Sequence, residues 1–407
     1  MNTIFVQIAS YRDPELVPTI KSLLDNAKYP GLLTICIAHQ YDENDQWDNL
    51  DEFKNDNRFI IIDIPHDESK GTCWARYQIQ RYYNNQKYAL QLDSHHRFSK
   101  NWDETCVEML RNLQIEGNPK PVLTTYLPSY DPTADPEERV ETPWGMSFDK
   151  FTPQGMVFFR PYYIEENATA PILARFFSGH FVFTLGRFCK DVPYDPHLYF
   201  HGEEISMAVR AYTSGFSLFH PHKVIAWHEY SREGRKKHWD DSTEWSVLDN
   251  KAQTRVRNLL GIDNQECTPC VKKTLLGYDV GKWSSIETYE MYAGISFKDR
   301  TVQQSTLDNK PPEFRDEKYL SNIRHTIVLE RKKIPNKGVK FGAVIYEDKN
   351  GDQINRQDYT PAQIASFIKD KHIEINSEFI GREPYKYIVW PYNQKNKWGN
   401  KIVQLIS

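Results

Sequence analysis

Four short apolar segments alternate with stretches of helical periodicity over the first hundred residues. The segments are residues 4–8, 32–38, 59–64 and 88–92. After the first of them, Leu16, Ile20 and Leu23 recur at the spacing of one helix face. Strands that alternate with helices form a largely parallel sheet with helices on both faces. We therefore expect an α/β fold with a mixed, mostly parallel sheet.

The fourth apolar segment ends in a group of polar residues, Asp93-Ser94-His95-His96. In α/β proteins, ligands bind beyond the carboxyl ends of the strands. Asp93 and His95 are two residues apart, so their side chains share one side of an extended segment. A carboxylate beside an imidazole suits a borderline divalent cation such as Mn²⁺, especially when phosphate oxygens complete the shell. A metal site is one interpretation of this strand end, and a solvated turn is the other.

Composition and charge exclude several classes of protein. The chain has 407 residues, which predicts two or three domains, and its net charge of −4 gives no electrostatic footprint for nucleic acid. No apolar run approaches the length that spans a bilayer, and residues 4–8 are too short a run for the apolar region of a secretory signal. The six cysteines are scattered, as in a reduced protein. We expect a cytoplasmic location without a membrane span or a nucleic-acid partner, and no role for Cys267-Thr-Pro-Cys270.

Two further polar loops fall at the same edge of the expected sheet. Ser10, Tyr11 and Arg12 follow the first strand, where they could stack on and hydrogen-bond a nucleoside, and Asp13 could cap the next helix. Gly71-Thr-Cys-Trp-Ala-Arg76 opens another helix. No G-x-G-x-x-G follows the first strand and no G-x-x-x-x-G-K-[ST] occurs. We therefore expect phosphate charge to be met by a metal ion.

In this order the motifs resemble those of the GT-A glycosyltransferases. Asp93-Ser94-His95 is similar to the Asp-x-His metal motif of the polypeptide N-acetylgalactosaminyltransferases. The combination of the three loops most resembles the cytoplasmic hydroxyproline-directed N-acetylglucosaminyltransferase family, over roughly residues 3–306. Asp-x-His alone is a weak motif, and the order of the motifs makes the resemblance fairly specific.

The resemblance implies three further features downstream. A small-residue segment beneath the donor sugar corresponds to residues 176–184, a Gly-Glu turn that opens a helix corresponds to residues 202–204, and a strand that supplies a third metal ligand corresponds to residues 224–230. The implied metal ligands are Asp93, His95 and His228, and the implied catalytic residues are Glu203, Glu204 and Arg76. The implied donor-binding residues are Ser10, Tyr11, Arg12, Gly71, Arg76, Ser94, Gly179, His180 and Trp239, with Arg97 as a second candidate beside the phosphates.

The activity implied is a metal-dependent, retaining transfer of N-acetylglucosamine, or another N-acetylhexosamine, from a UDP-sugar such as UDP-GlcNAc to a protein or glycan hydroxyl. A divalent ion bridging the two phosphates would stabilise the departing diphosphate. Because no carboxylate is assigned as a nucleophile, we expect a front-face transfer. The alternatives are a nucleotidyltransferase, a sugar-nucleotide hydrolase and a carbohydrate-binding adaptor without turnover. The missing glycine-rich loop argues against a nucleotidyltransferase, and the full set of site residues argues against an adaptor.

Two segments flank the expected site. Residues 231–239 are basic, contain Gly234 as a hinge and end at Trp239, which suits a lid that excludes water; a solvated loop is the alternative. Residues 118–163 are rich in Pro, Tyr and Trp and are too long for a tight connection, so we expect them to form walls on the acceptor side.

Three regions are expected. Residues 1–262 form the GT-A nucleotide-sugar-binding domain, residues 263–307 a helical cap or linker of the catalytic unit, and residues 308–407 a small β-rich C-terminal module. In that module we expect strands at 325–330, 340–346, 385–392 and 401–406, a hairpin turn at 349–352 and a capped helix near Thr360. Acceptor docking, homodimer formation and intramolecular bracing all fit the module.

Overall fold

The computed structural model describes residues 1–47, 49–231, 234–262, 275–330, 332, 339–369, 371–393 and 398–406. Cys267 and Cys270 lie outside this range. The chain divides into two compact units. Unit 1 consists of Met1–Lys298 with Asn309–Arg315, and unit 2 of Asp299–Asp308 with Asp316–Ser407.

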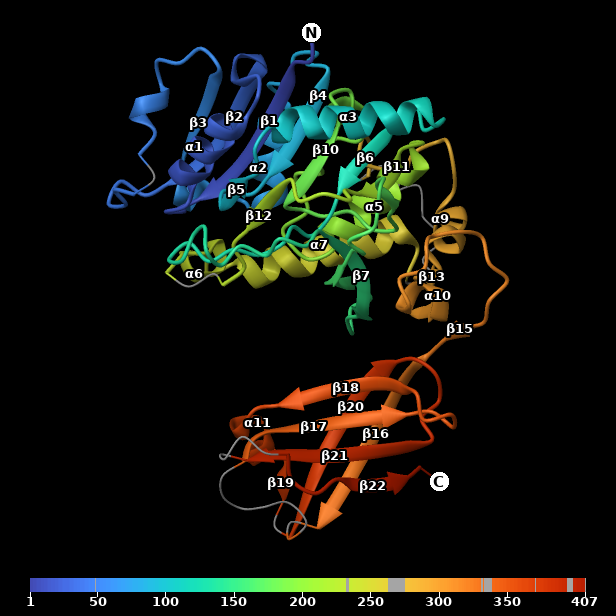
Figure 1. Ribbon diagram of the computed structural model, residues 1–407. Coiled ribbons are helices and arrows are strands. Elements are labelled where there is room, and N and C mark those ends of the chain that lie inside the picture. Colours follow the sequence, from blue (N-terminus) through green and yellow to red (C-terminus); the bar gives the residue numbers. More distant parts are fainter. Residues whose placement is uncertain are drawn as a thin grey trace. The chain divides into compact units, whose positions relative to one another are not determined.

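A mixed sheet of eight strands is the centre of the described part of unit 1 (Figure 1). Its order is β3 (Phe59–Pro65), β2 (Leu33–Tyr41), β1 (Ile4–Tyr11), β4 (Tyr88–Leu92), β10 (Phe181–Leu185), β6 (Pro121–Thr124), β11 (Ser217–His220) and β9 (Ile172–Leu173). The first four are parallel to one another, β10 is antiparallel to both its neighbours, β11 is parallel to β6, and β9 is antiparallel to β11. The expected mixed, mostly parallel sheet is confirmed.

Helices cover both faces of this sheet, with α1 (Leu16–Asn26) and α3 (Trp102–Ile115) on one face and α2 (Thr72–Gln80) on the other. The described part of unit 1 also contains α4 (Phe188–Asp191), α5 (Glu203–Thr213), α6 (His238–Asp241), α7 (Trp245–Leu260) and α9 (Ile286–Ala293), with 3-10 turns at Pro30–Leu32, Asp51–Phe53 and His66–Glu68. Side chains alternate along β1, so Ile4, Val6 and Ile8 join the core beneath α1 and α3, whereas Phe5 joins Ala75 and Ile79 of α2 on the opposite face. The helix that the sequence predicted at residues 246–260 is present, as α7.

Two short strand pairs lie outside the main sheet. β5 (His96–Phe98) pairs antiparallel with β12 (Ala226–His228), and β7 (Trp144–Phe151) forms a hairpin with β8 (Val157–Tyr163). The hairpin lies within residues 118–163, which we expected to form walls on the acceptor side and for which we predicted no strands. Its first strand buries consecutive residues from Gly145 to Phe148, and such a run lacks the alternation that marks a strand in sequence.

Unit 2 is rich in β-strands, as expected. Antiparallel β16 (Asn322–Glu330), β20 (His372–Ile380) and β19 (Ile368–Lys369) form one sheet, and β18 (Gln353–Tyr359), β17 (Val339–Glu347), β21 (Lys386–Asn393) and β22 (Ile402–Leu405) form another. Also in this unit are β14 (Thr301–Gln303), β15 (Tyr319–Leu320), α10 (Gln304–Leu307) and α11 (Pro361–Ser366), whereas β13 (Ile295–Ser296) belongs to unit 1. A shared apolar core includes Ile327, Val344 and Ile375.

In unit 2 the predicted turn and the predicted helix cap are present, whereas two of the strands were not predicted. The turn at 349–352 joins β17 to β18, and Thr360 caps α11 through a capping box with Gln363. β18 and β20 were not predicted. β18 is the polar edge of its sheet, so few of its side chains need to be apolar. Among the residues that the structure describes in either unit, no helix combines the length and the apolar character needed to cross a membrane.

Candidate functional site

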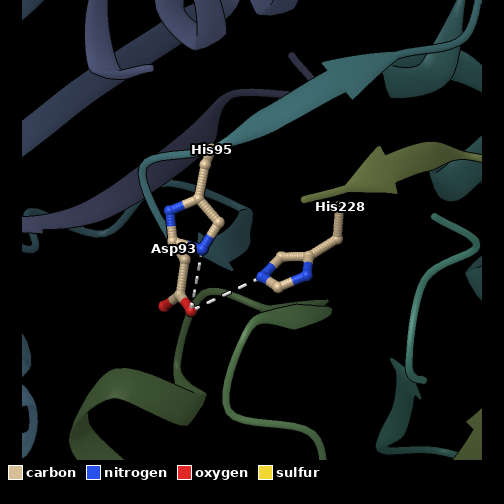
Figure 2. A group of neighbouring side chains, drawn as sticks. All are labelled: Asp93, His95 and His228. Atoms are coloured by element: carbon tan, nitrogen blue, oxygen red, sulfur yellow. Dashed lines mark ion pairs between the residues drawn. The ribbon is translucent and has the colours of Figure 1, made fainter. Parts of the chain in front are cut away.

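Asp93, His95 and His228 converge at the carboxyl end of β4 (Figure 2). Asp93 follows β4 directly, and the pairing of β5 with β12 places His228 opposite His96. Asp93 Oδ2 lies 3.9 Å from His95 Nε2 and 3.8 Å from His228 Nε2, and one ligand atom from each of the three residues lies within 4.8 Å of the others. Two residues separated by one position in the chain and a third more than a hundred positions away thus form a single cluster.

The donor set of this cluster fits a divalent cation. It offers one carboxylate oxygen and two imidazole nitrogens, which suit borderline ions such as Mn²⁺. His228 is buried, and neither of its ring nitrogens has a hydrogen-bond partner among the described residues. Burial alone would raise the pKa of Asp93, but the nearby His228 imidazole and the Arg76 guanidinium hold it well below its usual range. Asp93 is therefore ready to act as an anionic ligand.

Arg76 joins Asp93 to Glu203. Its Nη2 donates to Asp93 Oδ1 over 2.6 Å, and its Nη1 contacts Glu203 Oε1. Tyr194 donates to the same Glu203 oxygen over 2.8 Å. A Cβ on Gly179 would lie 3.2 Å from Glu203 Oε1 and 3.3 Å from Arg76 Nη1, so the small residue leaves room for this buried pair. The resemblance implied that Gly179 binds the donor, and the structure adds that the glycine leaves room for the Arg76–Glu203 pair.

Glu204 has a different environment from Glu203. Its Oε1 accepts the Gly179 amide over 2.9 Å, and its Oε2 accepts the Tyr126 hydroxyl over 2.9 Å. Burial, together with the charge of Glu203, raises the pKa of Glu204 to about 7, although the Gly179 amide opposes this shift. Both residues open α5 as the sequence predicted, and only Glu203 contacts the buried arginine.

Asp13 contacts His95, although the sequence predicted Asp13 only as a helix cap. Helix α1 begins later than expected, at Leu16, and the Glu15 amide donates to Asp13 Oδ1 over 2.9 Å. Asp13 Oδ2 accepts the Ser94 hydroxyl over 2.7 Å and lies 2.7 Å from His95 Nδ1. The sequence did indicate that Asp13 could lie near the site, because Asp13 is in the loop after β1 and that loop lies at the ligand edge of the sheet.

Helix α6 packs against the first loop. Tyr11 donates to Asp241 over 2.8 Å, and Arg12 pairs with Asp241 over 3.0 Å. Arg12 also pairs with Asp42 and Asp45. His238 lies 2.7 Å from the Tyr199 hydroxyl, through Nδ1, and the Trp239 and Phe200 rings are 5.5 Å apart. Arg232 and Glu233 of the predicted lid lie outside the described residues, and the segment from Gly234 onward contacts the Tyr11–Arg12 loop.

The remaining predicted site residues have supporting positions. Ser10 is fully buried at the end of β1. A Cβ on Gly71, whose φ is +101°, would lie 2.6 Å from the Tyr199 ring. The His180 ring stacks on His228 with centroids 4.1 Å apart, and its Nε2 accepts the Leu127 amide. Arg97, the second phosphate candidate, instead bonds to Glu15, Asp135 and Tyr130. His96 is also buried, and its ring centroid lies 4.9 Å from that of His228.

The sequence matches the family described as Glycosyltransferase (GlcNAc) over residues 3–58 and 48–299. The chain belongs to this glycosyltransferase family. No curated protein matches it.

A solved structure resembles this glycosyltransferase in fold. The structure of GalNAc-T7 with UDP, GalNAc and Mn²⁺ superposes with a TM-score of 0.51 at 13% identity, covering 71% of the present chain and 54% of GalNAc-T7. The chain thus spans about half the length of that protein. S. aureus TarS 1–349 in complex with UDP-GlcNAc is 11% identical, with 76% and 79% of the two chains covered and a TM-score of 0.39. The expected GT-A fold is confirmed by the sheet and the GalNAc-T7 likeness.

Proposed function

We propose that this glycosyltransferase is metal-dependent and transfers N-acetylglucosamine, or another N-acetylhexosamine, from a UDP-sugar to a hydroxyl of a protein or glycan acceptor, with retention of configuration. The observation that carries the proposal is the cluster of Asp93, His95 and His228 at the end of a central strand. The family match supports N-acetylglucosamine as the transferred sugar. The motif order favours the hydroxyproline-directed branch and a cytoplasmic location.

A divalent ion such as Mn²⁺ would be held by Asp93 Oδ2, His95 Nε2 and His228 Nε2. When bound, it would stabilise the negative charge of the departing UDP. The GalNAc-T7 structure contains UDP, GalNAc and Mn²⁺ together, which is the combination proposed for this chain. Arg76 fixes the orientation of Asp93 through Oδ1 and adds positive charge beside the same site.

The carboxylates of the site support a front-face transfer. Asp93 is assigned to the metal, and Glu203 is neutralised by Arg76. Both oxygens of Glu204 already accept hydrogen bonds, from Gly179 and Tyr126. Each of the three thus has a role or partner other than attack on the donor sugar, and in this proposal the departing phosphate serves as the base for the acceptor hydroxyl. In this proposal Glu204 orients a sugar hydroxyl.

In this proposal the described part of the basic segment, residues 234–239, covers the donor site together with the rest of α6. The contacts of Asp241 with Tyr11 and Arg12 fasten α6 to the loop that we assign to the nucleoside. Trp239 would exclude water from the diphosphate, which suppresses hydrolysis of the donor. We assign residues 1–262 to catalysis and 263–307 to its cap, and we propose that the module at 308–407 docks the acceptor or pairs two copies.

The proposal is tested by a donor screen. The purified chain is incubated with Mn²⁺ and a panel of UDP-sugars, and both UDP release and mass gained by candidate acceptors are followed. We expect UDP-GlcNAc or a related UDP-N-acetylhexosamine to be turned over and EDTA to stop the reaction. The proposal fails if no UDP-sugar is bound or turned over and EDTA changes nothing.

A further inference from the structure

Asp13 lies behind the candidate metal cluster and holds one of its ligands. It is 3% exposed, and its Oδ2 is 2.7 Å from His95 Nδ1, on the side of the ring away from Asp93. We propose that Asp13 is a positioning residue that sets the orientation and tautomer of His95 for metal binding. This inference rests on the proposed metal-dependent function.

The contact with Asp13 favours one tautomer of His95. An ionised carboxylate can only accept, so it favours a proton on the His95 nitrogen that faces it, Nδ1. In a neutral imidazole the other nitrogen then keeps its lone pair. That nitrogen, Nε2, is the one that lies 3.9 Å from Asp93 Oδ2. The pair thus has the arrangement in which a carboxylate fixes a metal-binding histidine and raises its basicity.

The rest of the surroundings hold Asp13 still. Its Oδ1 accepts the Glu15 amide over 2.9 Å, and its Oδ2 accepts the Ser94 hydroxyl over 2.7 Å. Ser94 lies between the two ligands Asp93 and His95 in the chain, so one carboxylate oxygen contacts both the strand end and the imidazole. Little freedom remains for the ring to turn. Asp13, two residues beyond β1, can in this way orient His95, which follows β4.

Arg235 extends the same contact to the segment that carries α6. Its Nη1 lies 3.2 Å from Asp13 Oδ2, and its Nη2 lies 2.7 Å from Glu229 Oε2. Glu229 directly follows His228, so Arg235 connects the carboxylates adjacent to both imidazole ligands. Arg235 Nη1 also contacts His95 Nδ1. A guanidinium can only donate, so it would favour the opposite tautomer of His95 if it, and not Asp13, set the ring.

The first test is the affinity for Mn²⁺ in the absence of donor. Electron paramagnetic resonance of Mn²⁺ titrated into wild type and Asp13→Asn measures it directly. Asparagine keeps an acceptor for the Glu15 amide and can place an NH₂ group against His95 Nδ1, which favours the proton on Nε2. We expect Mn²⁺ to bind roughly 10- to 100-fold more weakly, as for the loss of an outer-shell partner. Unchanged affinity in a folded Asp13→Asn protein overturns the inference.

Two variants serve as controls. Asp63→Asn alters another Asp–His pair, in which Asp63 Oδ1 lies 2.8 Å from His39 Nδ1 away from the cluster, and should bind Mn²⁺ like wild type. Arg235→Lys should change the Mn²⁺ affinity less than threefold. If Arg235→Lys weakens Mn²⁺ binding and Asp13→Asn does not, Arg235 sets the ring and the inference is wrong. If wild type itself binds no Mn²⁺, it is the proposed function that fails.

A measurement on the unmutated side chain keeps the inference testable if Asp13→Asn does not fold. In metal-free protein, ¹⁵N chemical shifts of the histidine rings report which nitrogen is protonated, and His95→Gln identifies the His95 signals by their loss. We expect the Nδ1–H tautomer of His95. The Nε2–H tautomer contradicts the proposed role of Asp13.

Discussion

Arg76 Nη2 donates to Asp93 Oδ1 over 2.6 Å and leaves Oδ2 of the same carboxylate to face His95 and His228. The other terminal guanidinium nitrogen contacts Glu203, so one buried side chain orients a candidate metal ligand and neutralises a second carboxylate. The two oxygens of Asp93 are therefore divided between the arginine and the candidate cation site. This division follows from the planar fork of a guanidinium, which a lysine ammonium cannot reproduce.

Arg76→Lys should therefore impair transfer while keeping the charge. A single ammonium cannot occupy both positions, so Asp93 loses its orientation or Glu203 loses its partner. We expect kcat/KM to fall by about 100-fold, equivalent to about 2.7 kcal/mol, and thermal stability to decrease. Arg81→Lys, at the exposed C-terminal end of the same helix, is the matched control and should behave as wild type. Wild-type kinetics in Arg76→Lys would refute the assigned role.

Glu204→Gln should lower the transfer activity and raise the stability of the protein, and the gain in stability should depend on pH. The pKa of Glu204 is raised from 4.5 to about 7, so this group's stabilising contribution is complete below about pH 4.5 and is lost as the pH rises through 7. Glutamine has no charge to bury. We expect the variant to gain roughly 1–3 kcal/mol in free energy of unfolding at pH 8, and clearly less at pH 5, while transfer falls at least tenfold.

Substitution of the neighbouring Glu203 should have the opposite effect on stability. Glu203→Gln leaves the guanidinium of Arg76 without one of its carboxylate partners, so it should destabilise the protein at pH 8. Denaturant unfolding of the two variants at pH 5 and pH 8 checks both signs. An equal gain for Glu204→Gln at the two pH values would show that the charge of this carboxylate is not the cause.

Trp239→Ala tests the lid. The side chain lies on α6 against Phe200, and Asp241 fastens the same helix to Tyr11 and Arg12. Removal of the indole should admit water to the closed site. We expect transfer to fall while the affinity for the donor is preserved, and the ratio of UDP-sugar hydrolysis to transfer to rise. Unchanged transfer together with unchanged hydrolysis, compared with the exposed control Trp283→Ala, would exclude a lid role.

Local sequence patterns were sufficient for the elements that carry Asp93 and His95. Strand β4 has the predicted bounds, and the polar residues after it lie at the ligand edge, because a short apolar run and its place in the alternating series of strands and helices determine both. His228 is different. Its place depends on the pairing of β5 with β12, a contact across more than a hundred residues that leaves no local pattern. The family resemblance, rather than periodicity, pointed to it.

The contacts of Asp13 and Arg235 could not be predicted from sequence. An aspartate before a proline at the start of a helix has a sufficient local explanation as a cap, and a basic residue in a polar loop has one as a solvated charge. The structure shows both side chains meeting at His95. Tertiary packing of three separate loops creates this contact, so neither residue carries a distinguishing neighbour pattern.

The most direct test of the account is the Mn²⁺ dependence of UDP-sugar turnover in wild type and His228→Ala. The account predicts that wild-type turnover saturates with Mn²⁺, stops with EDTA and returns when Mn²⁺ is restored. In folded His228→Ala it predicts a Mn²⁺ requirement at least tenfold higher and a lower maximal rate. Wild-type turnover that EDTA leaves unchanged, or a His228→Ala enzyme with the same Mn²⁺ requirement as wild type, would contradict it.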